Sequence, residues 1–193
     1  MNRRVAVSAI ALVLGAFALV AGRAVAGGTP VVRGTTAQDF ALRDQHGHVI
    51  RLSQQRGRIV LLTFLYTRCP DVCPLVATTL NTVLRSLSRK ERAGVRVIAV
   101  SVDPAHDTPR AVRAFARSHT LLPQFHYLVG SRSDLVPIWQ AYNLLIAVQS
   151  VERVSHSAYV LLIDRSGRPR IYYRSTVGAA AVLHDLRRLA LAR

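Results

Sequence analysis

The chain has 193 residues and half of them are hydrophobic, a size and composition that suit one α/β domain with its own core and argue against intrinsic disorder. The formal net charge is +16, and arginine supplies nearly all of the basic residues because Lys90 is the only lysine. Aromatic side chains that could stack on bases make up only 6% of the residues, so we expect no nucleic-acid partner. The charge either spreads over solvated faces or serves contact with an anionic membrane surface or an acidic protein domain.

The first 26 residues indicate export. Arg3 and Arg4 precede an uncharged apolar stretch from Val5 to Gly22, and an Ala-Val-Ala tripeptide suited to signal peptidase ends at Ala26. The stretch is also just long enough to cross a bilayer, so residues 1–26 are either a signal peptide or an N-terminal membrane anchor. Both alternatives place the rest of the chain in the periplasm or at the outer face of the inner membrane, an oxidising compartment.

Residues 27–37 are small, polar and interrupted by glycine and proline, which predicts a linker before a domain over 38–193. The segment "FALRDQHGHVIRLS" predicts a β-hairpin that turns at Gly47. The apolar run "RIVLLTFLY", 58–66, is typical of a strand buried on both faces of a mainly parallel sheet.

The remaining elements alternate between helix and strand. We expect a helix over 74–90, a buried strand over 95–103, and a helix capped by Thr108 that begins at Pro109. A strand at "FHYLVG", a helix from a capping Ser133 to about Tyr142, the hairpin "SAYVLLID"–"RPRIYYR" and a helix over about 179–192 follow. This order predicts an α/β, thioredoxin-like fold with a central mixed sheet flanked by helices and an added N-terminal β-hairpin.

Right-handed connections would bring the ends of the strands that finish at Tyr66 and Asp103 to one edge of the sheet. Ligands bind at that edge in open α/β sheets. The loops 67–73 and 103–108 both fall there, so we expect the functional site at this edge.

Cys69 and Cys73 are the only cysteines and lie in the first of these loops. Pro70 and Pro74 predict that the regular helix begins at Pro74, with Cys73 as its cap and Cys69 in the loop before it. The helix amides and dipole favour thiolates at such a position. A structural disulfide, a redox pair and a pair of metal ligands are the three alternatives.

A metal site needs further ligands, and His156 is the best placed of the seven histidines. It precedes the strand "SAYVLLID", in a loop that should lie against the cysteine loop. Two thiolates and one imidazole form a soft ligand set that favours Cu(I) or zinc, and the imidazole also suits Cu(II). Because structural zinc prefers four protein ligands, copper fits better.

Four spaced motifs resemble the Sco/SenC copper proteins, which are involved in cytochrome c oxidase assembly. They are "DFALRDQHGHVIRLS", "FLYTRCPDVCP" (64–74), "SVDPAHDTP" (101–109) and "HSAYVLLIDRSG" (156–167), and together they cover most of residues 37–192. The resemblance implies a thioredoxin-like domain in which Cys69, Cys73 and His156 bind copper as Cu(I) or Cu(II). Asp71 and Asp103 match acidic family positions near the site, where we expect electrostatic or supporting roles.

The partner that the resemblance implies is the copper-site subunit of cytochrome c oxidase or a similar copper protein. We therefore expect a metallochaperone for the binuclear copper centre, and not a turnover enzyme. The alternative is a thiol-disulfide oxidoreductase that reduces cysteines of a partner copper protein, with Cys69 as the attacking thiolate and Cys73 as the resolving thiol.

Overall fold

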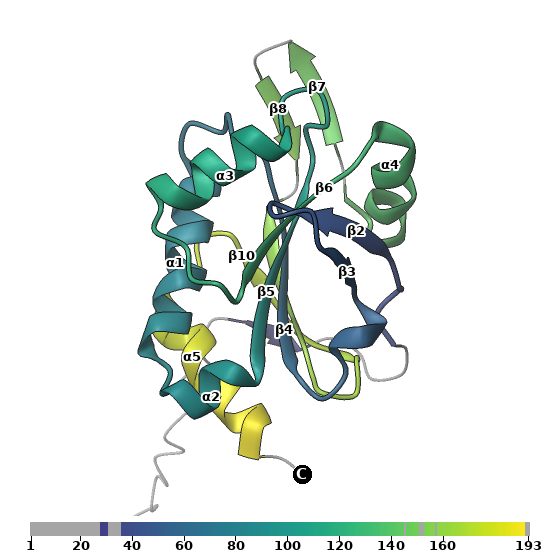
Figure 1. Cartoon of the computed structure of the whole chain (residues 1–193). Coiled ribbons are helices and arrows are strands. Elements are labelled where there is room, and N and C mark those ends of the chain that lie inside the picture. Colours follow the sequence, from purple (N-terminus) through teal and green to yellow (C-terminus); the bar gives the residue numbers. More distant parts are fainter. Residues whose placement is uncertain (1–27, 31–35, 145, 151–152, 157, 192–193) are drawn as a thin grey trace, which may run out of the picture.

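The structure is a computed structural model, and it describes residues 28–30, 36–144, 146–150, 153–156 and 158–191. For residues 147–150 and 153–156 it describes the backbone alone. A mixed sheet lies at the centre with helices on both faces (Figure 1). In chain order the elements are β1 (Thr29–Pro30), β2 (Ala41–Asp44), β3 (Val49–Arg51), η1 (Ser53–Gln55), β4 (Ile59–Leu65), α1 (Val72–Ser86), α2 (Arg89–Ala93), β5 (Val95–Ser101), α3 (Pro109–Ser118), β6 (Phe125–Val129), α4 (Arg132–Ala141), β7 (Ile146–Ser150), β8 (Arg153–His156), β9 (Tyr159–Ile163), β10 (Pro169–Arg174) and α5 (Ala179–Leu191).

The main sheet has the strand order β1-β10-β9-β4-β5-β6-β2-β3. Strand β4 pairs in parallel with β5 along its whole length, from Ile59 opposite Val95 to Leu65 opposite Ser101. All residues of β4 are buried, which confirms the prediction of a strand covered on both faces. Because β5 and β6 are also parallel, the carboxyl ends of three strands meet at one edge of the sheet. The expected mixed α/β architecture is thus confirmed.

Helices α1, α3 and α5 cover one face of the sheet, and α4 lies on the other (Figure 1). Helix α1 buries the apolar stripe Val76, Leu80, Val83 and Leu84 against the strands. On the opposite face, the Trp139 indole of α4 donates a hydrogen bond of 3.0 Å to the carbonyl of Ser101. The core that results lies between Phe40 and Leu186 in the sequence.

The predicted N-terminal hairpin is confirmed as β2 and β3, with Gly47 at a φ of +87° in the turn. It joins the sheet through β2 and β6, where Arg43 lies opposite Val129 and Asp44 opposite Leu128. The buried Gln45 side chain extends this pairing: its oxygen accepts from the Tyr127 amide at 2.7 Å, and its nitrogen donates to the Phe125 carbonyl at 2.9 Å. The Gln45 side chain thus forms the two hydrogen bonds to β6 that the backbone of a further strand residue would form.

Two helix starts and one helix end differ from the predictions. Helix α1 begins at Val72 and not at Pro74, and it ends at Ser86, because Ser88 caps the separate helix α2. The Ser88 hydroxyl and the Glu91 carboxylate form a reciprocal capping box there. Helix α4 is capped by Ser131 and not by Ser133, again because a capping box forms, here with Asp134.

Two short pairings were not predicted. Thr29–Pro30, inside the expected linker 27–37, pairs with β10 as strand β1. Strands β7 and β8 form a two-stranded sheet of their own. The expected signal peptide or anchor, 1–26, lies outside the described residues. Among the helices that are described, none combines the length and the apolar character needed to cross a bilayer. The domain limits therefore stay a prediction.

The Gln45 contacts predict a loss of stability on substitution. Gln45→Leu removes both hydrogen bonds to β6 and leaves the buried Tyr127 amide without an acceptor, so we expect the free energy of unfolding to fall by about 2 kcal/mol. Gln54→Leu, at an exposed glutamine in η1, is the matched control and should change it by less than about 0.5 kcal/mol. Urea unfolding of both variants measures this, and equal losses would contradict the role of Gln45.

Candidate metal centre

The cysteine loop leaves the buried carboxyl end of β4 and enters α1. It lies beside the loop that follows β5, because the Val102 amide donates a hydrogen bond of 3.0 Å to the Leu65 carbonyl. The parallel register of β4 and β5 thus brings the segments 66–71 and 102–108 together at one edge, as the sequence predicted.

Asp71 caps α1. Its carboxylate accepts from the Val72 amide at 2.5 Å, and Cys73 and Pro74 are then the second and third residues of the helix. Proline is tolerated in this first turn because the amides there have no partner within the helix. The prediction that Cys73 is the cap is therefore wrong: Cys73 lies inside the first turn, and its amide points back towards the loop.

That amide holds the two cysteines in one arrangement. The Cys73 backbone N–H donates to Cys69 Sγ at 3.3 Å, and Cys69 Sγ lies 3.8 Å from the Asp71 carboxylate. Cys73 is fully buried, Cys69 is half-buried, and no disulfide joins them. The loop therefore holds one partly accessible sulfur, that of Cys69, and one buried sulfur, that of Cys73.

The two sulfurs differ in protonation. A hydrogen bond from the Cys73 thiol, together with donors from the Asp71 and Cys73 backbones and the Tyr66 hydroxyl, lowers the pKa of Cys69 to about 6 against the effect of burial. The pKa of Cys73 is raised, because its proton is held by the Cys69 sulfur and its surroundings are buried. At neutral pH the pair is therefore one thiolate that shares the proton of one thiol.

A buried aspartate that the sequence analysis did not select fixes the base of this loop. The Asp107 carboxylate accepts from the Thr67 amide at 2.8 Å, the Thr67 hydroxyl at 2.7 Å and the Ser101 hydroxyl at 2.6 Å. It also accepts from Tyr127 at 3.2 Å, yet burial raises its pKa. The motif "SVDPAHDTP" contains it, but the spacing does not reveal which of its two acids contacts the cysteine loop.

The two aspartates that were selected have different surroundings. Asp71 lies beside Cys69, as described above. Asp103 turns to His106 instead, with the His106 Nδ1 atom 2.8 Å from its carboxylate. Asp103 thus orients the loop after β5, and its supporting role at the site stays a prediction.

His156 ends strand β8, in place of the predicted loop, with its Cα opposite that of Ile146. Its side chain is outside what the structure describes. Tyr159, three residues later, begins β9, and its carbonyl accepts from the Thr63 hydroxyl near the carboxyl end of β4. Strands β7 and β8 stand at the same end of the sheet as the cysteine loop (Figure 1). The fold therefore brings the His156 backbone to the expected end.

The described side chains supply two of the three expected metal ligands. Among the described residues, no group of three histidine, cysteine, aspartate or glutamate side chains could hold a metal ion. The two sulfurs at the start of α1 are soft metal ligands, and one of them is ionised at neutral pH. Leu75 beside it, which the helix pattern placed in the core, is 53% exposed instead.

The sequence model of the SCO1/SenC family matches residues 30–191 of the chain. The chain is 32% identical to apo Sco1 of Thermus thermophilus, with a TM-score of 0.73 over 84% of this chain and 95% of that one. It is 28% identical to Bradyrhizobium japonicum ScoI solved with copper bound, with a TM-score of 0.71 over 80% of this chain and 99% of that one. The SCO1 homologue of Bacillus subtilis is 29% identical over 135 residues, 68% of this chain and 69% of the relative.

Both solved relatives are matched over almost their whole length. The expected thioredoxin-like fold is confirmed by the same match. With the cysteine pair at the carboxyl edge of its sheet and a family match over residues 30–191, the chain belongs to the SCO1/SenC family.

Proposed function

We propose that the chain binds copper through Cys69, Cys73 and His156 and acts as a metallochaperone for the binuclear copper centre of cytochrome c oxidase. The observation that carries the proposal is the sulfur pair at the start of α1, where a low-pKa thiolate lies against the Cys73 amide at 3.3 Å. Copper is bound in the Bradyrhizobium relative of the same family, which supports the choice of metal.

In this proposal copper is the cargo of the site, and its preference for soft sulfur ligands provides the binding affinity. The Cys69 thiolate is the first donor, because it is ionised at neutral pH and half-buried. Cys73 becomes the second donor when it loses its shared proton to solvent. The imidazole of His156 would complete the set from the β8 side of the edge. Asp107 supports both sulfurs indirectly by holding Thr67 in place.

The second candidate is thiol-disulfide exchange, and the different protonation of the two sulfurs favours it. The Cys69 thiolate would attack a partner disulfide to form a mixed disulfide and release one partner thiol. Cys73 would then lose its proton, attack Cys69 and release the second partner thiol. Two electrons pass to the partner, and the pair ends as a Cys69–Cys73 disulfide.

The place of action that we propose is outside the inner membrane, in the periplasm or attached to the membrane. The N-terminal apolar stretch and its flanking arginines support export. Thiolate ligands in such an oxidising compartment must be reduced before they can accept metal. This requirement is common to both candidate functions.

The lowered pKa of Cys69 predicts the pH dependence of its reactivity. Alkylation of Cys69 by iodoacetamide should reach half its maximal rate at a pH of about 6, since the thiolate is the reacting form. In Cys73→Ala the main stabilising hydrogen bond is gone, and the midpoint should rise towards the ordinary value of about 8.5. Mass spectrometry of quenched samples measures the rate, and a midpoint near 8.5 in the unsubstituted protein would refute the shared proton.

Replacement of His156 tests the third ligand. His156→Ala should weaken Cu(I) affinity by more than about 100-fold, since even residues that only orient a ligand contribute 10- to 100-fold. The exposed His48, in the hairpin turn, is the matched control, and His48→Ala should keep the affinity. Competition with a chromophoric Cu(I) chelator under anaerobic conditions measures both.

The same variant separates the two candidate functions. Thiol-disulfide exchange needs only the sulfur pair, so His156→Ala should still form and exchange the Cys69–Cys73 disulfide at an unchanged rate. Unchanged copper affinity and absorption in His156→Ala would reject the three-ligand site and leave the exchange reaction as the better explanation. Reconstitution with copper and with zinc, followed by metal counting, establishes which metal the pair prefers.

A further inference from the structure

The positive charge of the chain is distributed unevenly along the strands. The segments at the amino end of β4 and β5, residues 56–58, 89–96 and 164–168, contain eight basic and two acidic residues. We call these three segments the basic end. The segments at the carboxyl end, 67–71, 102–110 and 130–134, contain three basic and four acidic residues. The two ends of the sheet therefore differ strongly in charge.

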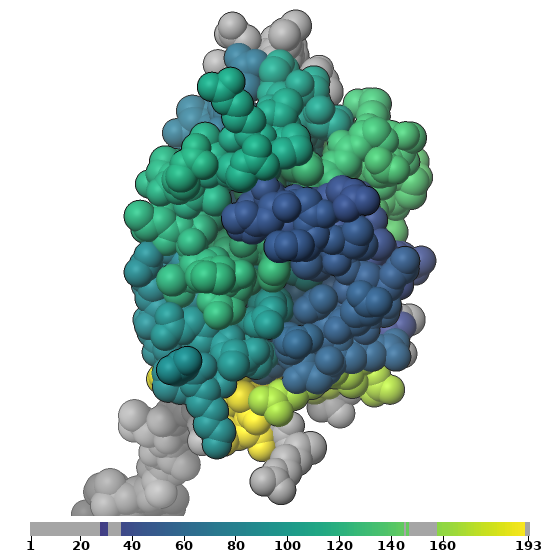
Figure 2. Space-filling view, in the orientation of Figure 1, coloured from purple at the N-terminus to yellow at the C-terminus, as the bar shows by residue number. Residues whose placement is uncertain are grey.

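The three segments form one continuous surface. The Gly57 amide donates to the Arg165 carbonyl at 2.8 Å, and the Ile59 amide donates to the Gly94 carbonyl at 2.9 Å. Figure 2 shows the blue residues before β4, the teal α2 region and the yellow-green turn between β9 and β10 together at the lower end. Burial lowers the pKa of Arg96, and the charge of the neighbouring Arg58 lowers it further.

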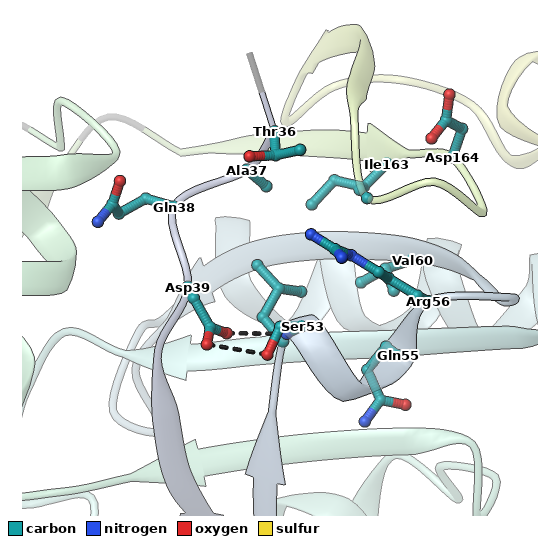
Figure 3. A pocket seen from close by; sticks show the side chains of 12 residues that line it. Thr36, Ala37, Gln38, Asp39, Ser53, Gln55, Arg56, Val60, Ile163 and Asp164 are labelled. Carbon is teal, nitrogen blue, oxygen red and sulfur yellow. Dashed lines mark hydrogen bonds between the residues drawn. The ribbon is translucent and has the colours of Figure 1, made fainter.

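The acids of the basic end are already engaged. Glu91 pairs with Arg187 at 3.3 Å and Asp164 pairs with Arg170 at 3.2 Å. In the nearby hollow that Arg56 lines, the Asp39 carboxylate is turned to Ser53, while the Arg56 side chain extends over Val60 towards Ile163 (Figure 3). Within the described part of the chain, Arg56, Arg165 and Arg168 form no ion pair, and all three are exposed.

The composition of this surface distinguishes between classes of anionic partner. Its segments contain no aromatic residue on which a base could stack, so nucleic acid is disfavoured. They also lack the large apolar side chains that form the centre of protein interfaces. An anionic lipid surface requires neither, because arginines near the headgroups are attracted by charge alone.

We infer that the basic end, residues 56–58, 89–96 and 164–168, docks on the anionic phospholipid surface of a membrane. Strand β4 has seven residues and spans about 20 Å, so the cysteine loop faces away from the lipid at roughly that height. The acidic residues at the carboxyl end of the sheet lie farther from the lipid than the screening length of about 10 Å, so the anionic surface does not repel them. This inference does not depend on the proposed copper binding or on the three proposed ligands.

Vesicle binding of residues 28–193 tests the inference, because this part contains every core residue that the structure describes and leaves out the apolar stretch. The probe is a vesicle of phosphatidylcholine with or without phosphatidylglycerol, and cosedimentation gives the partition coefficient. We expect binding only with phosphatidylglycerol. The double variant Arg56→Gln/Arg165→Gln should lower the partition coefficient about 5-fold for each charge removed.

The matched control removes the same charge from the other end of the sheet. Arg110→Gln/Arg132→Gln changes two exposed arginines at the starts of α3 and α4, and it should leave the partition coefficient within about 2-fold. Thermal unfolding confirms that both double variants are folded. Equal losses in the two variants would show that net charge alone is responsible and would overturn the inference. Binding to polyglutamate, with no preference for phosphatidylglycerol, would assign the basic end to an acidic protein and overturn it as well.

Discussion

The unbroken parallel pairing of β4 and β5 is the constraint on which the rest of the structure depends. Seven residues of each strand pair in register, so both strands start at one edge of the sheet and end at the other. The cysteine loop and the loop that follows β5 are therefore neighbours, and the segments that enter the two strands are neighbours at the opposite edge. Because of this pairing, the two cysteines and the basic end lie at opposite edges of the sheet, one strand length apart.

At the sulfur end, rigidity comes from the buried Asp107. Its carboxylate receives hydrogen bonds from the cysteine loop through Thr67, from β5 through Ser101 and from β6 through Tyr127. A buried carboxyl with four donors thus ties the cysteine loop to β5 and β6, two strands that are already paired with each other. The cysteines can then differ in exposure and protonation while the loop keeps its position.

The fold was predictable where a local pattern decides the structure. The buried run of β4, the Thr108–Pro109 helix start and the hairpin turn at Gly47 are such cases. The start of α1 was misplaced because proline indicates a first turn but not which of its positions proline occupies, and the Asp71 cap decides that. Strands β7 and β8 were missed because they are short and pair only with each other, so no long apolar run in the sequence marks them.

The site was predictable only in part for a similar reason. The spacing of Cys69 and Cys73 predicted two sulfurs close together at a helix start, and the strand order placed them at the correct edge. Both Asp103 and Asp107 are buried, but only Asp107 reaches the cysteine loop, through hydrogen bonds to Thr67, 40 residues away, whereas Asp103 contacts the nearby His106. Periodicity and spacing do not encode such contacts.

The single proton held between the two sulfurs has a consequence for the charge balance of metal uptake. Before loading, the pair carries one negative charge, because Cys69 is ionised and Cys73 is not. In the proposed complex, a monovalent copper ion takes the place of that proton, so the net charge of the sulfur pair stays the same. A divalent ion would neutralise the pair instead. The oxidation state of the bound ion would therefore appear as a difference of one unit of charge at the start of α1.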